Sequence, residues 1–134
     1  MSSFKHIDNE DFYPKECEHV EYSVVFRATK NISDLSVIDF LPSSVEYKNQ
    51  IKTFTRKFVQ SDYSVSVFTD LDALKATVKR IPSLDAKTKA YAKGFTTIKR
   101  GISHKENSNH HVNYYLFDYE FNSPKDDFSV IEVR

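Results

Sequence analysis

The chain has 134 residues, about the commonest size for one domain, and its 19 basic and 19 acidic residues leave no formal net charge. A neutral chain has no overall field to draw in nucleic acid or an anionic membrane surface. Its single cysteine cannot form an internal disulfide, and no apolar run approaches the roughly 20 residues of a membrane-spanning helix. We therefore expect a single domain over residues 1–134, with neither a membrane nor nucleic acid as its partner.

The N-terminal third contains one segment that resembles a strand. Residues 1–18 lack the apolar stretch of a signal peptide and show no regular hydrophobic period, which predicts an arm or loop and a cytoplasmic protein. Residues 19–28 alternate at first and then become continuously apolar, as a strand does when it enters the middle of a sheet. Residues 29–36 are polar and predict a loop, and residues 37–42 form a short apolar anchor that ends in a proline.

A helix is predicted next. Ser43 with Glu46 has the pattern of a capping box, and apolar residues follow at helical spacing to about Val59. Residues 53–55 would also suit a strand, because threonine and phenylalanine favour extended backbone.

The centre of the chain is a strand that runs directly into a capped helix. Over residues 63–68 the side chains alternate between an apolar face and a face that carries Ser64 and Ser66. Thr69 and Asp72 then have the spacing of a capping box, and one apolar stripe continues until Pro82. We expect the strand to be internal in a sheet and the helix to cover that sheet.

Four more elements are predicted in the C-terminal part. Residues 85–93 contain good helix formers and end at Gly94, and residues 95–102 predict a strand that leads into a polar loop. Residues 112–121 form the richest β segment, with an all-aromatic face that we expect in the core, and residues 128–133 predict a last strand. The fold prediction is α+β: a mixed or mostly antiparallel sheet of about five strands with two or three covering helices.

The histidines do not predict a metal site. His104, His110 and His111, with Cys17 and His19 upstream, supply atoms that zinc accepts. Adjacent histidines on a strand point to opposite faces, and the chain has neither a CxxC pair nor an HExxH helix. We therefore expect no metal.

Three polar residue types stand in order on the predicted strands: Arg27, then Ser64-Val65-Ser66, then Glu132. This layout resembles the Arg-Ser-Glu class of ADP-ribosyltransferase-like proteins. The resemblance implies that Arg27 holds a phosphate or ribose of NAD, that Ser64 or Ser66 braces the nicotinamide pocket, and that Glu132 is the catalytic carboxylate. A planar guanidinium suits phosphate, and a carboxylate stabilises developing positive charge, so these roles are chemically sound.

The same resemblance makes NAD the candidate substrate, with Phe68 or Tyr115 to stack on the nicotinamide ring. Val130 stands where that family has a second acid, which favours NAD binding or hydrolysis over transfer to a protein. The layout of Arg27, residues 39–42, residues 64–68 and His110-His111 is also similar to small uncharacterised bacterial proteins.

Two other interpretations remain open. Arg27 could pair with an acidic neighbour while the two serines and Glu132 lie at solvated positions, which would be structural roles. The chain could also be a non-enzymatic interaction or immunity-type module that binds a protein partner through exposed aromatic residues and its acidic N-terminal arm. The pattern does not decide the oligomeric state.

Overall fold

One antiparallel sheet organises the fold. The computed structural model describes residues 4–14, 20–49, 56–105 and 109–134, and within these ranges six strands lie side by side in the order β4-β5-β2-β1-β3-β6. Every neighbouring pair is antiparallel. The strands are β1 (Val25–Thr29), β2 (Val65–Phe68), β3 (Ala90–Gly94), β4 (Gly101–Lys105), β5 (His111–Leu116) and β6 (Phe128–Val133). The α+β prediction is confirmed, with one strand more than the expected five.

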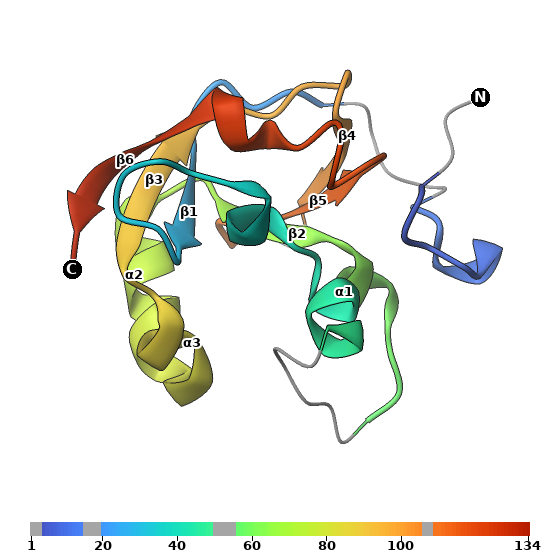
Figure 1. Ribbon diagram of the computed structural model, residues 1–134, viewed down its shortest axis with the longest axis horizontal. Helices are drawn as coiled ribbons and strands as arrows, with labels where there is room; N and C mark the ends of the chain where they lie inside the picture. Colours follow the sequence, from blue (N-terminus) through green and yellow to red (C-terminus); the bar gives the residue numbers. More distant parts are fainter. Residues whose placement is uncertain (1–3, 15–19, 50–55, 106–108) are drawn as a thin grey trace.

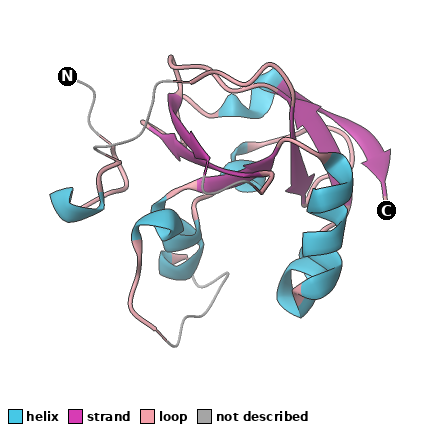
Figure 2. Ribbon diagram, turned by 180° about the vertical axis from the view of Figure 1, so that it is seen from behind, coloured by secondary structure: helices cyan, strands magenta, loops and turns pink. Residues whose placement is uncertain are grey.

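Three α-helices in the described residues accompany the sheet: α1 (Ser43–Lys48), α2 (Leu71–Arg80) and α3 (Pro82–Lys87). Figure 1 shows α1 on one side and the α2–α3 pair on the other, with the sheet running above both groups. The same two groups are seen from behind in Figure 2, where β6 forms the outer edge of the sheet next to the C-terminus. Of the helices that the structure describes, none is both long enough and apolar enough to pass through a bilayer.

The predicted central unit is present. Strand β2 lies between β5 and β1, which confirms that it is internal. Helix α2 packs Leu74 and Val78 against Phe68, as its apolar stripe predicts. The cap differs from the prediction, because Asp70 is the N-cap and its carboxylate accepts a hydrogen bond from the Ala73 amide.

The described residues form three apolar clusters. The largest packs one face of the sheet against the turn at residues 37–40, and a second packs the other face against α2. A third joins Phe4 and Ile7 of the N-terminal segment to Tyr63 and Tyr115. Strand β5 is buried on both faces from Val112 to Leu116, and this buried stretch includes the polar Asn113.

The aromatic strand ends earlier than predicted. Strand β5 stops at Leu116, and the Asp118 carboxylate accepts hydrogen bonds from the amides of Glu120 and Phe121, which closes a turn. The Phe121 side chain is therefore 91% exposed rather than in the core.

The prediction of a helix over residues 85–93 is correct only as far as Lys87 and wrong after it. Helix α3 ends at Lys87, and the following Ala90–Gly94 segment is β3, which lies between β1 and β6. A methyl group at Gly94 would approach the Asp127 carbonyl and the Phe128 ring to 2.4 Å, so small residues here permit close strand packing. Pairing with two distant strands overrides the local helix propensity of the alanines and lysines.

Three other boundaries shift. The strand predicted over residues 19–28 begins only at Val25, and the strand predicted over residues 95–102 is irregular before β4 begins at Gly101. Thr96 explains both changes, because it donates its amide to Tyr22 and accepts the Tyr22 amide through its hydroxyl, outside any regular ladder.

The helix predicted from Ser43 to Val59 ends at Lys48, with Pro42 as its N-cap. Further along the chain, the Val59 amide donates to the Asp62 carboxylate instead of a helical carbonyl. Residues 53–55, for which a strand was the alternative, lie outside the described residues, and so does most of the arm after residue 14. Strand β6 has the predicted bounds.

Candidate functional site

A cavity of about 650 Å³ is lined by residues of β1, β2, α1, α2 and α3. Its volume falls in the range of roughly 300–1,000 Å³ that small-molecule sites occupy. Leu74 and Leu84 line its apolar side, and its polar lining comes from β1, β2, β5, the three helices and the segments next to them. Arg80 and Ser83 are exposed and mark its rim.

The cavity forms where two neighbouring strands separate. The register between β1 and β2 contains one pair, Phe26 with Phe68, whereas β1 pairs with β3 along its whole length. Beyond that single pair, the Arg27 side chain connects the two strands, because its Nη1 donates to the Ser66 carbonyl at 2.8 Å. Arg27 thereby supplies a hydrogen bond where the two backbones do not pair.

Arg27 is a half-buried charged group. Its Nε donates to the Asp39 carbonyl at 2.8 Å, and its guanidinium carbon lies 5.9 Å from the centre of the Phe40 ring. Burial lowers the pKa of Arg27, although the charges of Glu46 and Asp39 act in the opposite direction. Among the described residues, no carboxylate lies within ion-pair distance of the guanidinium, and Nη2 makes no hydrogen bond.

The carboxylate of Asp39 is hydrogen-bonded to the loop beside β1. Its Oδ1 accepts hydrogen bonds from the amides of Lys30 and Asn31, and its Oδ2 accepts from the Asn31 side chain and the Ser36 amide. The side chain is fully buried, and four donors satisfy it. Asp39 therefore fixes the loop and offers Arg27 only its backbone carbonyl.

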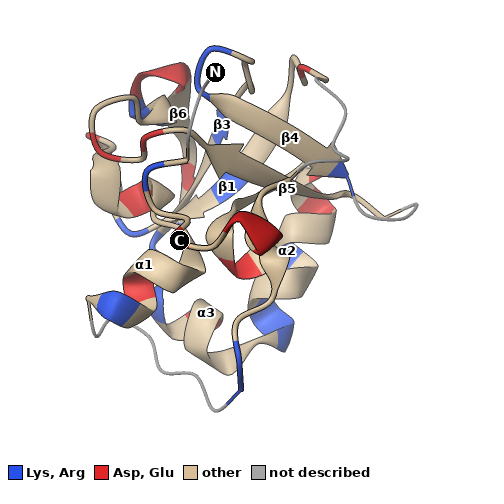
Figure 3. Cartoon of the chain, turned by 90° about the vertical axis from the view of Figure 1, so that its right-hand side faces the viewer, with Lys and Arg blue, Asp and Glu red and all other residues tan. Residues whose placement is uncertain are grey.

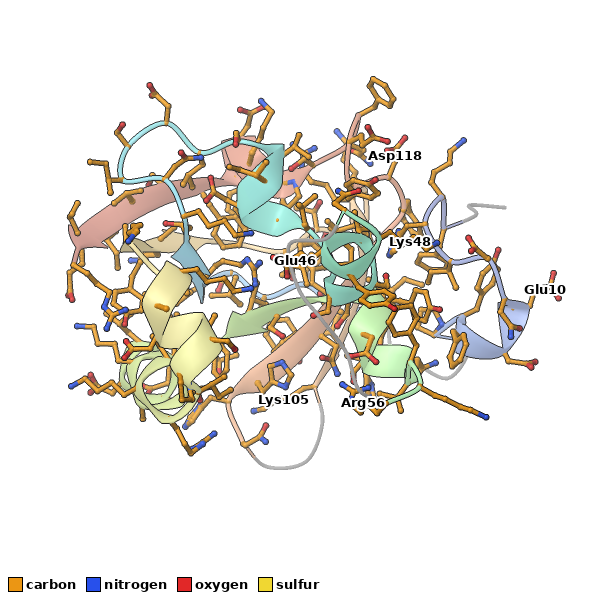
Figure 4. The ribbon with its side chains drawn as sticks, turned by 60° about the horizontal axis from the view of Figure 1, so that its bottom comes forward. Glu10, Glu46, Lys48, Arg56, Lys105 and Asp118 are labelled. Carbon is orange, nitrogen blue, oxygen red and sulfur yellow. The ribbon has the colours of Figure 1, made fainter. Side chains whose placement is uncertain are left out.

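Glu46 is the other acid of the cavity, and two lysines hold its carboxylate. Lys30 Nζ lies 2.9 Å and Lys87 Nζ 3.5 Å from Glu46 Oε2. Burial raises the pKa of Glu46, but the hydrogen bond from Lys30 and the charges of Lys30, Lys87 and Arg27 outweigh it, so the net shift is downward. Figure 4 shows Glu46 near the middle of the molecule, whereas Glu10 lies at its edge.

The cavity is more positive than the rest of the protein. Its described lining contains four lysine and arginine residues but only two carboxylates, while the whole chain is neutral. On the face drawn in Figure 3, by contrast, basic and acidic residues are mixed along the helices. An anionic ligand would thus meet an excess of positive charge in the cavity.

A serine and a histidine form a close pair on the cavity wall. Ser66 Oγ lies 2.9 Å from His111 Nε2, across the β2–β5 pairing, and the Phe68 ring lies 5.2 Å from the imidazole ring. Ser64 also lines the cavity, but its hydroxyl is buried and bonded to the Ser61 carbonyl and to Asn113 Oδ1. Of these two serines, only Ser66 has its hydroxyl within hydrogen-bond distance of a potential base, His111.

The structure brings three of the four predicted site residues together. Arg27, Ser64 and Ser66 line the cavity, and so does Phe68. Glu132 is not among the lining residues, because its carboxylate pairs with Lys75 Nζ of α2 at 2.8 Å. Tyr115, the other stacking candidate, is buried in the cluster around Phe4.

A bulge in β6 sets the direction of Glu132. Val130 pairs with Ala92, and regular alternation would place Glu132 opposite Ala90, on the face that carries Arg27. The register shifts by one residue, so Glu132 lies opposite Tyr91 instead. A one-residue shift moves a side chain to the other face, which separates Glu132 from Arg27.

Sequence reasoning missed three contributors to the cavity: Asp39, Glu46 and the pairing of His111 with Ser66. The Asp39-Phe40-Leu41-Pro42 stretch and the His110-His111 pair were visible as motifs, but their roles depend on contacts between distant segments. No cluster of three His, Cys, Asp or Glu side chains suited to a metal ion occurs in the described parts of the chain, from which Cys17 and His19 are excluded.

Comparisons with protein-family models, with curated proteins and with solved structures found no match to this chain. The site is therefore described by its own geometry: a positively charged cavity with a half-buried arginine and a serine–histidine pair on its wall.

Proposed function

We propose that this protein binds a small anionic molecule, of the phosphate-bearing nucleotide type, in the cavity lined by residues of β1, β2, α1, α2 and α3. The observation that carries the proposal is Arg27, a half-buried guanidinium on the cavity wall whose hydrogen bonds go to neutral carbonyls. Partial burial of a cation without a paired carboxylate costs free energy, and a bound phosphate or carboxylate would offset that cost.

NAD is the specific candidate that the resemblance to ADP-ribosyltransferase-like proteins implies. Arg27 and Phe68 in one cavity support a site for a phosphate and a ring. The lysine-paired position of Glu132 argues against a catalytic role for that residue, so NAD binding has more support than NAD cleavage.

Isothermal titration with NAD, ADP and inorganic pyrophosphate tests the proposal. We expect heat with at least one of these ligands at millimolar concentration or below. Arg27→Met should weaken binding by roughly 10- to 150-fold, because a hydrogen bond to a charged group contributes about 1.5–3 kcal/mol. Arg27→Lys keeps the charge but loses the planar fork, and it should give an intermediate loss.

Matched controls separate the cavity from general charge effects. Arg56 pairs with Asp62 outside the cavity, so Arg56→Met should leave affinity unchanged, and Glu132→Gln should do the same. The absence of heat with all three ligands, or an Arg27→Met variant that binds as tightly as the parent, would contradict the proposal. Thermal melts of each variant show whether it is folded.

A second candidate function is a protein-interaction module, which Phe121 favours. This residue is 91% exposed at the turn after β5, and phenylalanine is among the residues enriched in protein–protein interfaces. Phe121→Ser should then release a copurifying partner while Arg27→Met retains it. A partner held equally by parent and Phe121→Ser would contradict this candidate.

A further inference from the structure

We propose that Ser66 is a nucleophile activated by His111, and that the cavity hydrolyses a carboxylic ester. The substrate class, an ester that also carries a phosphate or carboxylate, rests on the proposed function. The assignment of Ser66 and His111 as nucleophile and base rests on their own contact and does not depend on the proposed function.

The first step of the argument is the contact. Ser66 Oγ and His111 Nε2 are 2.9 Å apart, within the reach that general-base catalysis requires, and both residues line the cavity. They are held on two paired strands, with Ser66 opposite Asn113 and His111 opposite Phe68. A contact between two strands of one sheet is fixed more firmly than a contact between loops.

The second step is the environment of the hydroxyl. Ser66 and His111 are both partly exposed, so a ligand in the cavity could reach them, whereas Ser64 is only 3% exposed. The Phe68 ring packs at 5.2 Å from the imidazole ring and limits its rotation. The histidine is thus directed towards the hydroxyl.

The third step is a donor for developing negative charge. Arg27 bonds to the carbonyl of Ser66 itself, which brings its guanidinium to the same residue as the nucleophile. Nη2 carries N–H groups without hydrogen bonds to the described residues. These groups could stabilise either an oxyanion or the anionic part of the substrate.

The reaction uses only the substrate and water. Ser66 Oγ attacks the ester carbonyl carbon while His111 Nε2, with the ring proton on Nδ1, takes the hydroxyl proton. The bond from the carbonyl carbon to the alcohol oxygen then breaks, and the leaving oxygen takes that proton. Water then attacks the acyl carbon and gives a proton to His111 Nε2. The bond from that carbon to Ser66 Oγ breaks, Oγ takes the proton from Nε2, and the acid leaves.

Labelling with a fluorophosphonate tests the pair without reliance on the anion site. We expect one adduct by intact-protein mass spectrometry, located on Ser66 by peptide mapping. Ser66→Ala should remove it, and His111→Gln should slow labelling at least about 100-fold, the usual contribution of a general base. Ser129→Ala on β6 and His104→Gln on β4 lie outside the cavity and should label at the parent rate.

Turnover provides the second readout. Hydrolysis of the neutral ester p-nitrophenyl acetate should show a burst that is lost in Ser66→Ala, and circular dichroism melts confirm that the variants are folded. Absence of an adduct, an adduct on Thr69 next to His110, or labelling unaffected by His111→Gln would overturn the proposal.

Pyrophosphate distinguishes the two proposals. If it binds and slows labelling, both are supported. Labelling of Ser66 with no binding of any anion supports the pair and contradicts the proposed function. Anion binding with no labelling supports the proposed function and contradicts the role of the Ser66–His111 pair.

Discussion

The guanidinium of Arg27 donates a hydrogen bond to the backbone carbonyl of Ser66, and this side chain joins β1 to β2 where their backbones have separated. One residue therefore contributes to the sheet and to the wall of the cavity. Its structural and binding roles can be measured separately, because folding and ligand affinity have different readouts.

We expect Arg27→Met to lower the free energy of unfolding by roughly 1–3 kcal/mol. The substitution leaves the carbonyls of Ser66 and Asp39 without a donor, and an unsatisfied buried acceptor costs about that much. Urea denaturation measures the change. Arg134→Met, which removes a surface ion pair with Asp85, should cost less, and an equal cost in both variants would contradict the assignment.

Asp39→Asn should destabilise the protein by about 2–4 kcal/mol. The new amide nitrogen cannot accept a hydrogen bond, so it would face donors of Asn31 and Ser36 or of Lys30 and Asn31. Chemical denaturation with Asp34→Asn as the control tests this, since Asp34 is exposed in the same loop. A neutral result for Asp39→Asn would show that its hydrogen bonds do not hold the loop.

Gly94→Ala should also be destabilising, by roughly 1–3 kcal/mol or more. The added methyl group would lie 2.4 Å from the Asp127 carbonyl oxygen and from the Phe128 ring, so β3 and β6 would have to move apart. Lys93→Ala changes the exposed neighbour on the same strand and serves as the control for thermal melts. If both variants melt at the parent temperature, β3 and β6 are not packed this closely.

The buried His6 predicts a pH dependence of stability. Burial lowers the pKa of His6 below its usual 6.5, and the charge of Lys48 acts in the same direction. The Tyr63 carbonyl, which lies 2.6 Å from His6 Nε2, and the charges of Asp118 and Asp8 oppose the shift only in part.

Below pH 6.5 the unfolded chain therefore binds a proton at His6 that the folded chain does not. Stability should fall as the pH drops below about 6.5, by at most about 1.4 kcal/mol per pH unit, and level off once the folded His6 is protonated. This pH dependence is measured by urea denaturation midpoints between pH 5 and 8 for the parent, His6→Gln and His104→Gln. An unchanged slope in His6→Gln would reject His6 as the cause.

Glu46→Gln should tighten the binding of pyrophosphate. The change removes a negative charge from the cavity and leaves Lys30 and Lys87 without their carboxylate partner. One unit charge interacts across solvent with about 1 kcal/mol at close range, which is about fivefold in Kd. Titration calorimetry at low salt detects a change of this size, and weaker binding would mean that Glu46 organises the site rather than repels the ligand.

The candidate site residues show which features of the site a local sequence pattern can predict. Arg27, Ser64 and Ser66 were predicted to share a site, and they line one cavity because β1 and β2 are neighbours in the sheet. Residue order does not show on which face of the sheet the Glu132 side chain lies, because a bulge next to Val130 moves this side chain to the opposite face. The pairing of Ser66 with His111 was also hidden, since it depends on the register of β2 against β5.

The sequence by itself determined the elements whose period is strong and local: the β2–α2 unit, with its alternating strand and apolar helical stripe, and the last strand β6. Tertiary structure decided β3, because Ala90–Gly94 has helix-forming residues and becomes a strand only by pairing with β1 and β6. Tertiary structure also forms the cavity, because β1 and β2 separate after one pair of facing residues. Hydrogen bonds between distant segments carry no local periodicity, so these features appear only in the folded chain.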